Sequence, residues 1–163
     1  MIKQAAGSLY SDPAANNPII DVICYNLLPN HFHLLVKQNI KGGISKFMHK
    51  VCSGYAWYFN YKYNRSGSLF QGRFKASHIT HNEYLLYLSA YINANSQIHS
   101  IQEASKWSWS SYDEYVGKFQ YDLIKPRIIT DQFKNKGEYA KFVSKIISNS
   151  SGLKMVRKHI IEG

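Results

Sequence analysis

Residues 19–38, IIDVICYNLLPNHFHLLVKQ, constrain the fold more than any other part of this sequence. The first ten are rich in β-branched and aromatic residues, as a buried strand is. The dipeptide Pro29–Asn30 then turns the chain, and residues 31–38 predict a second strand. Because side chains alternate along a strand, His31 and His33 are expected on the same face. This stretch therefore predicts a β-hairpin that presents two imidazoles on one side.

Apolar spacing and helix-start signals predict the elements that follow. A last amphipathic helix is expected at about 131–149, interrupted near Gly137, and residues 106–117 form an irregular aromatic segment. The other three elements are an amphipathic helix from Ile44 to Phe59, a strand at 69–79, and a helix started by the capping box of Thr80 and Glu83.

Composition narrows the class of partner. The chain has 20 Lys and Arg against 10 Asp and Glu, a net charge of +10, which favours nucleic acid first and an acidic membrane second. The 13 tyrosines and 8 phenylalanines strengthen the first option, because aromatic faces stack on unpaired bases. No apolar run is long enough to span a membrane, no signal-peptide pattern is present, and the two cysteines form no C-x-x-C pair. A cytoplasmic protein is expected.

A His-x-His pair on one strand supplies two imidazole nitrogens that could hold one metal ion. The pair alone is compatible with purely structural or surface histidines, and a metal needs further ligands. Zinc would favour a cysteine, but a cysteine among apolar neighbours is more often a small core residue. The further candidates are Asp21, Cys24, His49, Cys52, His78, His81, Glu83, Asn95 and His99.

The helix that follows residue 80 offers a second pair of residues. Tyr91 and Asn95 are four residues apart, so they lie one above the other on the same helix face. An amide oxygen is a hard ligand suited to Mg²⁺ or Mn²⁺, and a phenol can act as a nucleophile. The alternative for Asn95 is a helix C-cap. Only the combination with His31 and His33 indicates a site.

Five motifs in order resemble those of one family, the REP-associated tyrosine transposases, which are single-tyrosine members of the HUH endonuclease superfamily. The resemblance spans about residues 19–145. The motifs are YNLLPNHFHLLV, GSLFQGRFKASHI, YLLYLSAYINANSQ, WSWSSYDEY, and the run from Asp131 to Val143 with its E-Y-x-x-F-V ending.

The resemblance implies an α+β fold: a ferredoxin-like sandwich with a central antiparallel sheet and helices on one face. It implies that His31, His33 and Asn95 bind Mg²⁺ or Mn²⁺ and that Tyr91 is the nucleophile. The implied activity is cleavage and rejoining of single-stranded or hairpin DNA through a 5′-phosphotyrosine. The residues expected to contact this DNA are Lys46, Lys50, Gln71, Arg73 and Lys75.

The chain is expected to divide into three parts. An irregular N-terminal segment is expected at 1–18, the transposase domain at 19–117, and a basic helical extension at 118–163. The family places a strand and a helix before its histidine strand, so the first strand of the sheet is expected to be missing here. The alternative function is therefore a catalytically inactive remnant that binds DNA hairpins. Whether the protein is a monomer or a homodimer is left open.

Overall fold

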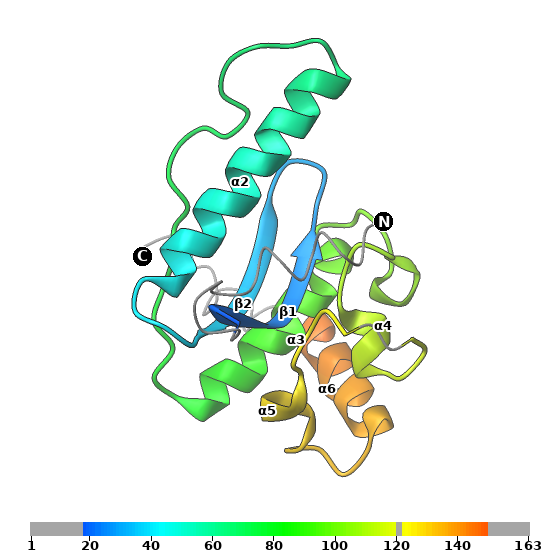
Figure 1. Ribbon diagram of the computed structural model, residues 1–163. Helices are drawn as coiled ribbons and strands as arrows, with labels where there is room; N and C mark the ends of the chain where they lie inside the picture. The colour runs from blue at the N-terminus through cyan, green and yellow to red at the C-terminus, as the bar shows by residue number, and fades with distance from the viewer. Residues whose placement is uncertain (1–17, 120–121, 150–163) are drawn as a thin grey trace. The chain divides into compact units, whose positions relative to one another are not determined.

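The predicted β-hairpin is present in the computed structural model, which describes residues 18–119 and 122–149 (Figure 1). Strands β1 (Ile20–Leu27) and β2 (Phe32–Gln38) pair as an antiparallel two-stranded sheet. The turn between them is closed by the Leu28 N–H, which donates to the carbonyl of His31 over 2.9 Å. The predicted segment 1–18 lies outside the described residues except for Pro18, as does the basic end at 150–163.

The chain divides into two compact units. The first consists of Met1–Asp21 and Lys37–Lys75, and the second of Val22–Val36 and Ala76–Gly163. Each strand of the hairpin therefore has one end in the first unit and the larger part of its length in the second. An α+β class is confirmed.

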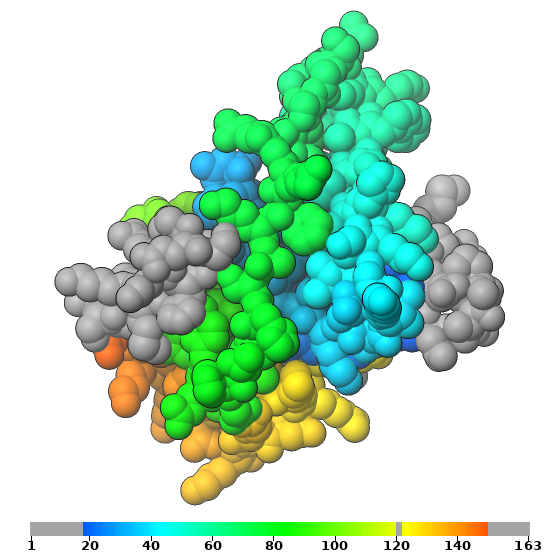
Figure 2. Space-filling view, turned by 90° about the vertical axis from the view of Figure 1, so that its left-hand side faces the viewer, coloured from blue at the N-terminus to red at the C-terminus, as the bar shows by residue number. Residues whose placement is uncertain are grey.

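The first unit is built on helix α2 (Gly43–Lys62), as the spacing from Ile44 predicted. Gly42 precedes it with φ +71°, in the left-handed region that favours glycine. Gly43 packs directly against the backbone carbonyl of Ile19, where a Cβ would collide. After the helix the chain turns back along it (Figure 1; Figure 2). Asn60 Nδ2 donates to the carbonyl of Gly67 over 2.9 Å, which helps to fasten this returning segment.

The strand predicted at 69–79 is wrong. The segment has no strand conformation, and residues 71–78 are exposed. Within the described ranges the only sheet is the β1–β2 hairpin. A strand requires a hydrogen-bonded neighbour, so the interleaved Phe70 and Phe74 do not form one here, where the described residues contain no partner strand for the segment.

The second unit packs helix α3 (Asn82–Ile98) against helix α6 (Lys136–Ser148). Short elements complete it: the 3₁₀ helix η1 (Ala104–Lys106), α4 (Tyr112–Tyr115) and α5 (Arg127–Thr130). Tyr115 and Tyr139 are almost fully buried, with ring centroids 4.7 Å apart. The hydroxyl of Tyr115 donates to the carbonyl of Ile23 on β1 over 3.0 Å. The hairpin is thus tied into the core of this unit.

Two predicted helix boundaries differ from the structure. Helix α3 begins at Asn82 after His81, and no side chain caps it, so the predicted capping box of Thr80 and Glu83 does not form. Instead Asn82 and Gln132 exchange two side-chain hydrogen bonds of 2.7 and 3.0 Å at the start of the helix. A contact between residues far apart in sequence therefore replaces the local capping signal.

At the other boundary, the last helix begins at Lys136 and not near 131. Its N-cap is Asn135, whose side-chain oxygen accepts from the Glu138 N–H over 3.0 Å, while the Glu138 carboxylate accepts from the Lys134 N–H over 2.6 Å. Gly137 lies inside the first turn and does not interrupt the helix. None of the helices described here is both long and apolar enough to cross a lipid bilayer.

Candidate active site

The two histidines of the hairpin lie together in the second unit. His31 immediately precedes β2 and His33 lies on it, with ring centroids 5.1 Å apart and rings nearly perpendicular. The Nδ1 atom of His31 is 2.7 Å from the side-chain oxygen of Asn30. When Nδ1 carries the hydrogen of this bond, Nε2 keeps its lone pair. Asn30 thereby favours the tautomer of His31 that can act as a ligand through Nε2.

One face of α3 lies against these imidazoles. Tyr91, Asn95 and His99 follow one another at intervals of four residues, so they form a stripe along the helix. The Tyr91 ring is 6.2 Å from the His33 ring, centroid to centroid. The His99 ring is 5.6 Å from that of His31. The structure therefore brings the predicted strand residues and the predicted helix residues together, and it adds His99 beside them.

The environment of the two hairpin histidines favours their neutral form. Burial, and then the charges of His31 and His99, lower the pKa of the His33 imidazole from 6.5 to about 4. The pKa of His31 is also lowered, first by burial and then by His99. At neutral pH both rings are therefore unprotonated, and only unprotonated imidazole coordinates a metal.

Asn95 is fully buried, and neither its amide oxygen nor its amide nitrogen has a hydrogen-bond partner in the described part of the chain. Asn93, two residues earlier and equally buried, donates to the Tyr139 hydroxyl over 2.8 Å and accepts from the Ser111 hydroxyl over 2.7 Å. An unpaired buried polar group costs about 1–3 kcal/mol. The C-cap alternative for Asn95 is wrong, because the C-cap of α3 is His99. Asn95 lies on α3 between Tyr91 and His99, whose rings lie near those of His33 and His31, so this unpaired buried amide is a candidate ligand.

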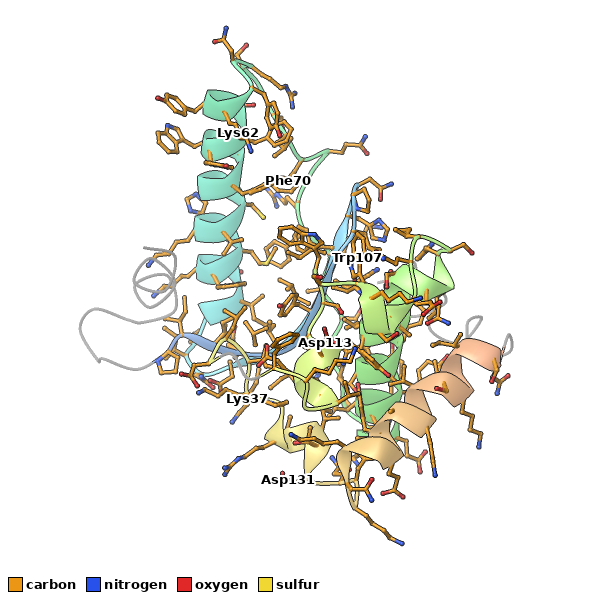
Figure 3. All side chains as sticks on the ribbon, turned by 90° about the vertical axis from the view of Figure 1, so that its right-hand side faces the viewer. Lys37, Lys62, Phe70, Trp107, Asp113 and Asp131 are labelled. Atoms are coloured by element: carbon orange, nitrogen blue, oxygen red, sulfur yellow. The ribbon has the colours of Figure 1, made fainter. Side chains whose placement is uncertain are left out.

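A set of hydrogen bonds positions α3 against β1. The side chain of Asn26, fully buried on β1, donates to the carbonyl of Ile92 over 2.8 Å and accepts from the Trp107 indole N–H over 3.0 Å. Figure 3 labels Trp107 beside the hairpin. The Ser111 hydroxyl, which donates to Asn93, also accepts from the backbone N–H of Tyr25 over 3.0 Å. These bonds hold the backbone next to Tyr91 in place.

Sequence reasoning missed these positioning residues. Asn26, Asn93, Trp107 and Ser111 all belong to the motifs that carried the resemblance, but no local pattern assigns them a role. Their partners are between 18 and 86 residues away along the chain. The available signal was chemical: asparagine within otherwise apolar strand and helix segments needs partners once it is buried.

The donors available to a metal are restricted. In residues 18–119 and 122–149, no three His, Cys, Asp or Glu side chains are placed to hold one ion. Cys24 is fully buried, and desolvation raises the pKa of its thiol, which disfavours the thiolate that zinc requires. The candidate donors are the neutral imidazoles of His31 and His33, whose ring centroids are 5.1 Å apart, and the amide of Asn95, one turn after Tyr91 on α3. This set fits a divalent cation that accepts oxygen and nitrogen ligands.

The five residues predicted to contact DNA are exposed and belong to the first unit: Lys46, Lys50, Gln71, Arg73 and Lys75. The first two lie on α2 and the others on the segment that follows it. No Asp or Glu occurs anywhere between residues 22 and 82. The cations of this stretch therefore have no acidic neighbour within it to neutralise them.

Comparison with known families defines the class of protein as a transposase. The family model described as "Transposase IS200 like" matches residues 8–95, more than half of the 163 residues. The chain therefore belongs to the IS200-like transposase family, which implies DNA binding and DNA strand transfer. The match includes His31, His33, Tyr91 and Asn95. Neither the comparison with curated proteins nor the one with solved structures found a match.

Proposed function

We propose that this transposase is a metal-dependent strand transferase of the REP-associated, single-tyrosine type, which cleaves and rejoins single-stranded hairpin DNA. The observation that carries the proposal is the juxtaposition of the α3 stripe with the hairpin histidines, with the Tyr91 ring 6.2 Å from that of His33. A candidate nucleophile next to a neutral imidazole that can bind a metal ion supplies the parts that such a reaction requires. We further propose that the hairpin belongs to a ferredoxin-like sheet.

Tyr91 has the central role in the proposed reaction. Its hydroxyl group gives up its proton to solvent as the oxygen attacks the scissile phosphorus, and the bond from phosphorus to the 3′-oxygen breaks. The 3′-oxygen leaves and takes up a proton, while the 5′-phosphate remains linked to Tyr91. One phosphodiester bond replaces another, so a second 3′-hydroxyl can reverse the step and join a new strand.

The ligands proposed for the metal are His31, His33 and Asn95. A bound Mg²⁺ or Mn²⁺ supplies Lewis acidity to the scissile phosphate. The protein contributes the rest through its own groups: neutral imidazoles, a desolvated amide, and the Asn26 hydrogen bonds that hold the backbone beside Tyr91. Because these groups hold the reacting parts in place beforehand, the entropic part of the activation barrier is smaller.

A covalent-adduct assay tests the proposal. The wild-type chain is incubated with hairpin DNA carrying a randomised single-stranded flank and a label at its 3′ end, in Mg²⁺ or Mn²⁺, and resolved under denaturing conditions. Because Tyr91 keeps the 5′-phosphate, the labelled 3′ fragment should migrate with the protein. The adduct should disappear in Tyr91→Phe and persist in Tyr87→Phe, a matched tyrosine one turn earlier on α3.

Metal binding is measured separately, by titrating Mn²⁺ and following its electron paramagnetic resonance signal. His33→Gln should weaken binding about tenfold or more, since one of few ligands is removed. Salt-sensitive DNA binding without any adduct would instead support the inactive remnant. An adduct that survives in Tyr91→Phe would assign the nucleophile to another residue.

A further inference from the structure

The C-terminal half of α2 carries a concentration of aromatic residues that the proposed chemistry does not use. Six of the nine residues from 55 to 63 are aromatic. Trp57 is 71% exposed and Tyr61 is 79% exposed, although both rings are large and apolar. Water contact with so much aromatic surface is unfavourable, so it indicates an interaction site.

The two most exposed rings form a flat surface. Trp57 and Tyr61 are one helical turn apart, and their rings stack with centroids 5.7 Å apart and an angle of only 9° between planes. Parallel rings of this kind can be extended by another flat ring, and a nucleic-acid base is one. The exposed large apolar side chains of α2 are all aromatic, without an exposed leucine or isoleucine among them.

Positive charge accompanies these rings. Lys62, labelled in Figure 3 at the end of α2, lies with its ammonium 5.7 Å from the Tyr58 ring and 5.4 Å from the Tyr63 ring. The Arg65 guanidinium lies 5.6 Å from the Phe59 ring. Since residues 22–82 contain no acid, this end of α2 complements a polyanion.

We propose that Trp57 and Tyr61 form a stacking platform for unpaired bases of single-stranded DNA, with Lys62 and Arg65 contacting the adjacent phosphates. The proposal rests on the proposed function for the identity of the ligand and extends it to a surface of the first unit. Bases inside a duplex have their faces covered by neighbours, so the platform selects single strands over paired DNA. Stacking is tolerant of sequence, so it holds the strand without specifying it.

Binding of labelled oligothymidine in EDTA, where no cleavage occurs, tests this platform. Trp57→Ala and Tyr61→Ala should each weaken binding about tenfold or more, the loss expected for one base–aromatic stack. The matched control is Trp109→Ala, which removes a tryptophan of the second unit that is 63% exposed. It should change the affinity less than about twofold. A blunt duplex of the same length should bind all four proteins alike.

A conservative variant gives an optical readout. Trp57→Phe keeps a flat ring and should bind oligothymidine within about threefold of wild type, but it should lose the quenching of tryptophan fluorescence that accompanies binding. Lys62→Gln should reduce the slope of log affinity against log salt by about 0.7, the value for one phosphate contact on a single strand. Trp57→Ala should leave that slope unchanged.

Several outcomes would overturn the platform. One is unchanged oligothymidine affinity in Trp57→Ala, and another is an equal loss of duplex affinity. A wild-type dimer that Trp57→Ala dissociates would assign the rings to a second copy of the chain. If Trp57→Ala loses the ability to bind vesicles of anionic lipid but keeps its affinity for DNA, the two rings belong to a membrane-binding surface. The adduct assay tests the proposed function separately. If Trp57→Ala forms the adduct and binds oligothymidine as tightly as the wild type, only the platform is refuted. If oligothymidine binding depends on Trp57 and Tyr61 but the wild type forms no adduct, only the proposed function is refuted.

Discussion

Replacing Asn26 by alanine should lower the free energy of unfolding of the second unit by about 2–4 kcal/mol. The fully buried side chain makes two hydrogen bonds, of 2.8 Å to the Ile92 carbonyl and 3.0 Å from the Trp107 indole. Each contributes about 1 kcal/mol net, and a partner left buried without its bond adds a desolvation penalty of about 1–3 kcal/mol. Part of that penalty is relieved where water can reach Trp107, which is only half-buried.

Asn82→Ala is the matched control for this prediction. Asn82 also makes two side-chain hydrogen bonds, both with Gln132, but at an exposed position. Its loss should cost less than about 0.5 kcal/mol, because water replaces the lost partners. Urea unfolding is followed by tryptophan fluorescence in a Trp57→Phe background, so that the two remaining tryptophans report on the second unit alone.

The comparison of the two variants decides the matter. Equal losses, within about 0.5 kcal/mol, would show that burial does not give the Asn26 bonds their weight, and the account of how α3 is positioned would be wrong. If the account holds, Asn26→Ala should also form less adduct than Asn82→Ala at a temperature where both remain folded. The backbone beside Tyr91 is then no longer held in place.

Three further predictions concern single residues. Burial depresses the pKa of His33 in the folded chain to about 4, so the unfolded state binds the proton more readily. The free energy of unfolding should therefore fall as the pH drops from 6.5 towards 4. Urea unfolding in EDTA at several pH values should show this fall in the wild type and a smaller one in His33→Gln. Asn95→Leu removes an unpaired amide, so its urea concentration at half-unfolding should equal or exceed that of the wild type. Its affinity for Mn²⁺ should drop about tenfold or more. A clearly lower urea midpoint would argue against an unpaired amide. Gly43→Ala should destabilise the first unit by about 1–3 kcal/mol, because the new Cβ meets the Ile19 carbonyl. Gly54→Ala places its Cβ in open space and should stabilise α2 by up to about 1 kcal/mol. Thermal unfolding that ranks the two variants in the opposite order would refute this prediction.

The elements predicted correctly are those whose signal is local. The hairpin follows from alternation and a Pro-Asn turn, and α2 follows from apolar spacing, because both patterns act between near neighbours in sequence. The strand at 69–79 failed because pairing depends on a partner that the segment itself does not encode. The start of α3 was placed too early because the Asn82–Gln132 contact spans fifty residues.

The candidate site divides in the same way. His31 with His33, and Tyr91 with Asn95, could be proposed as pairs because each pair lies on, or directly beside, one regular element with a known period. The distinction between Asn93 and Asn95 could not, because periodicity does not show which of two nearby asparagines finds partners in Ser111 and Tyr139. That distinction requires the packing of α6 and of the segment after η1 against α3.

Asn93 and Asn95 should be under different kinds of selection. The Asn93 side chain makes hydrogen bonds that stabilise the fold, so selection for folding retains Asn93 whether or not the protein still cuts DNA. Within residues 18–119 and 122–149 the Asn95 side chain makes no hydrogen bond, so only its proposed chemistry protects it from replacement by an apolar residue. In lineages that have lost mobility, Asn95 should therefore decay while Asn93 persists. Lineages under selection for transposition should keep both.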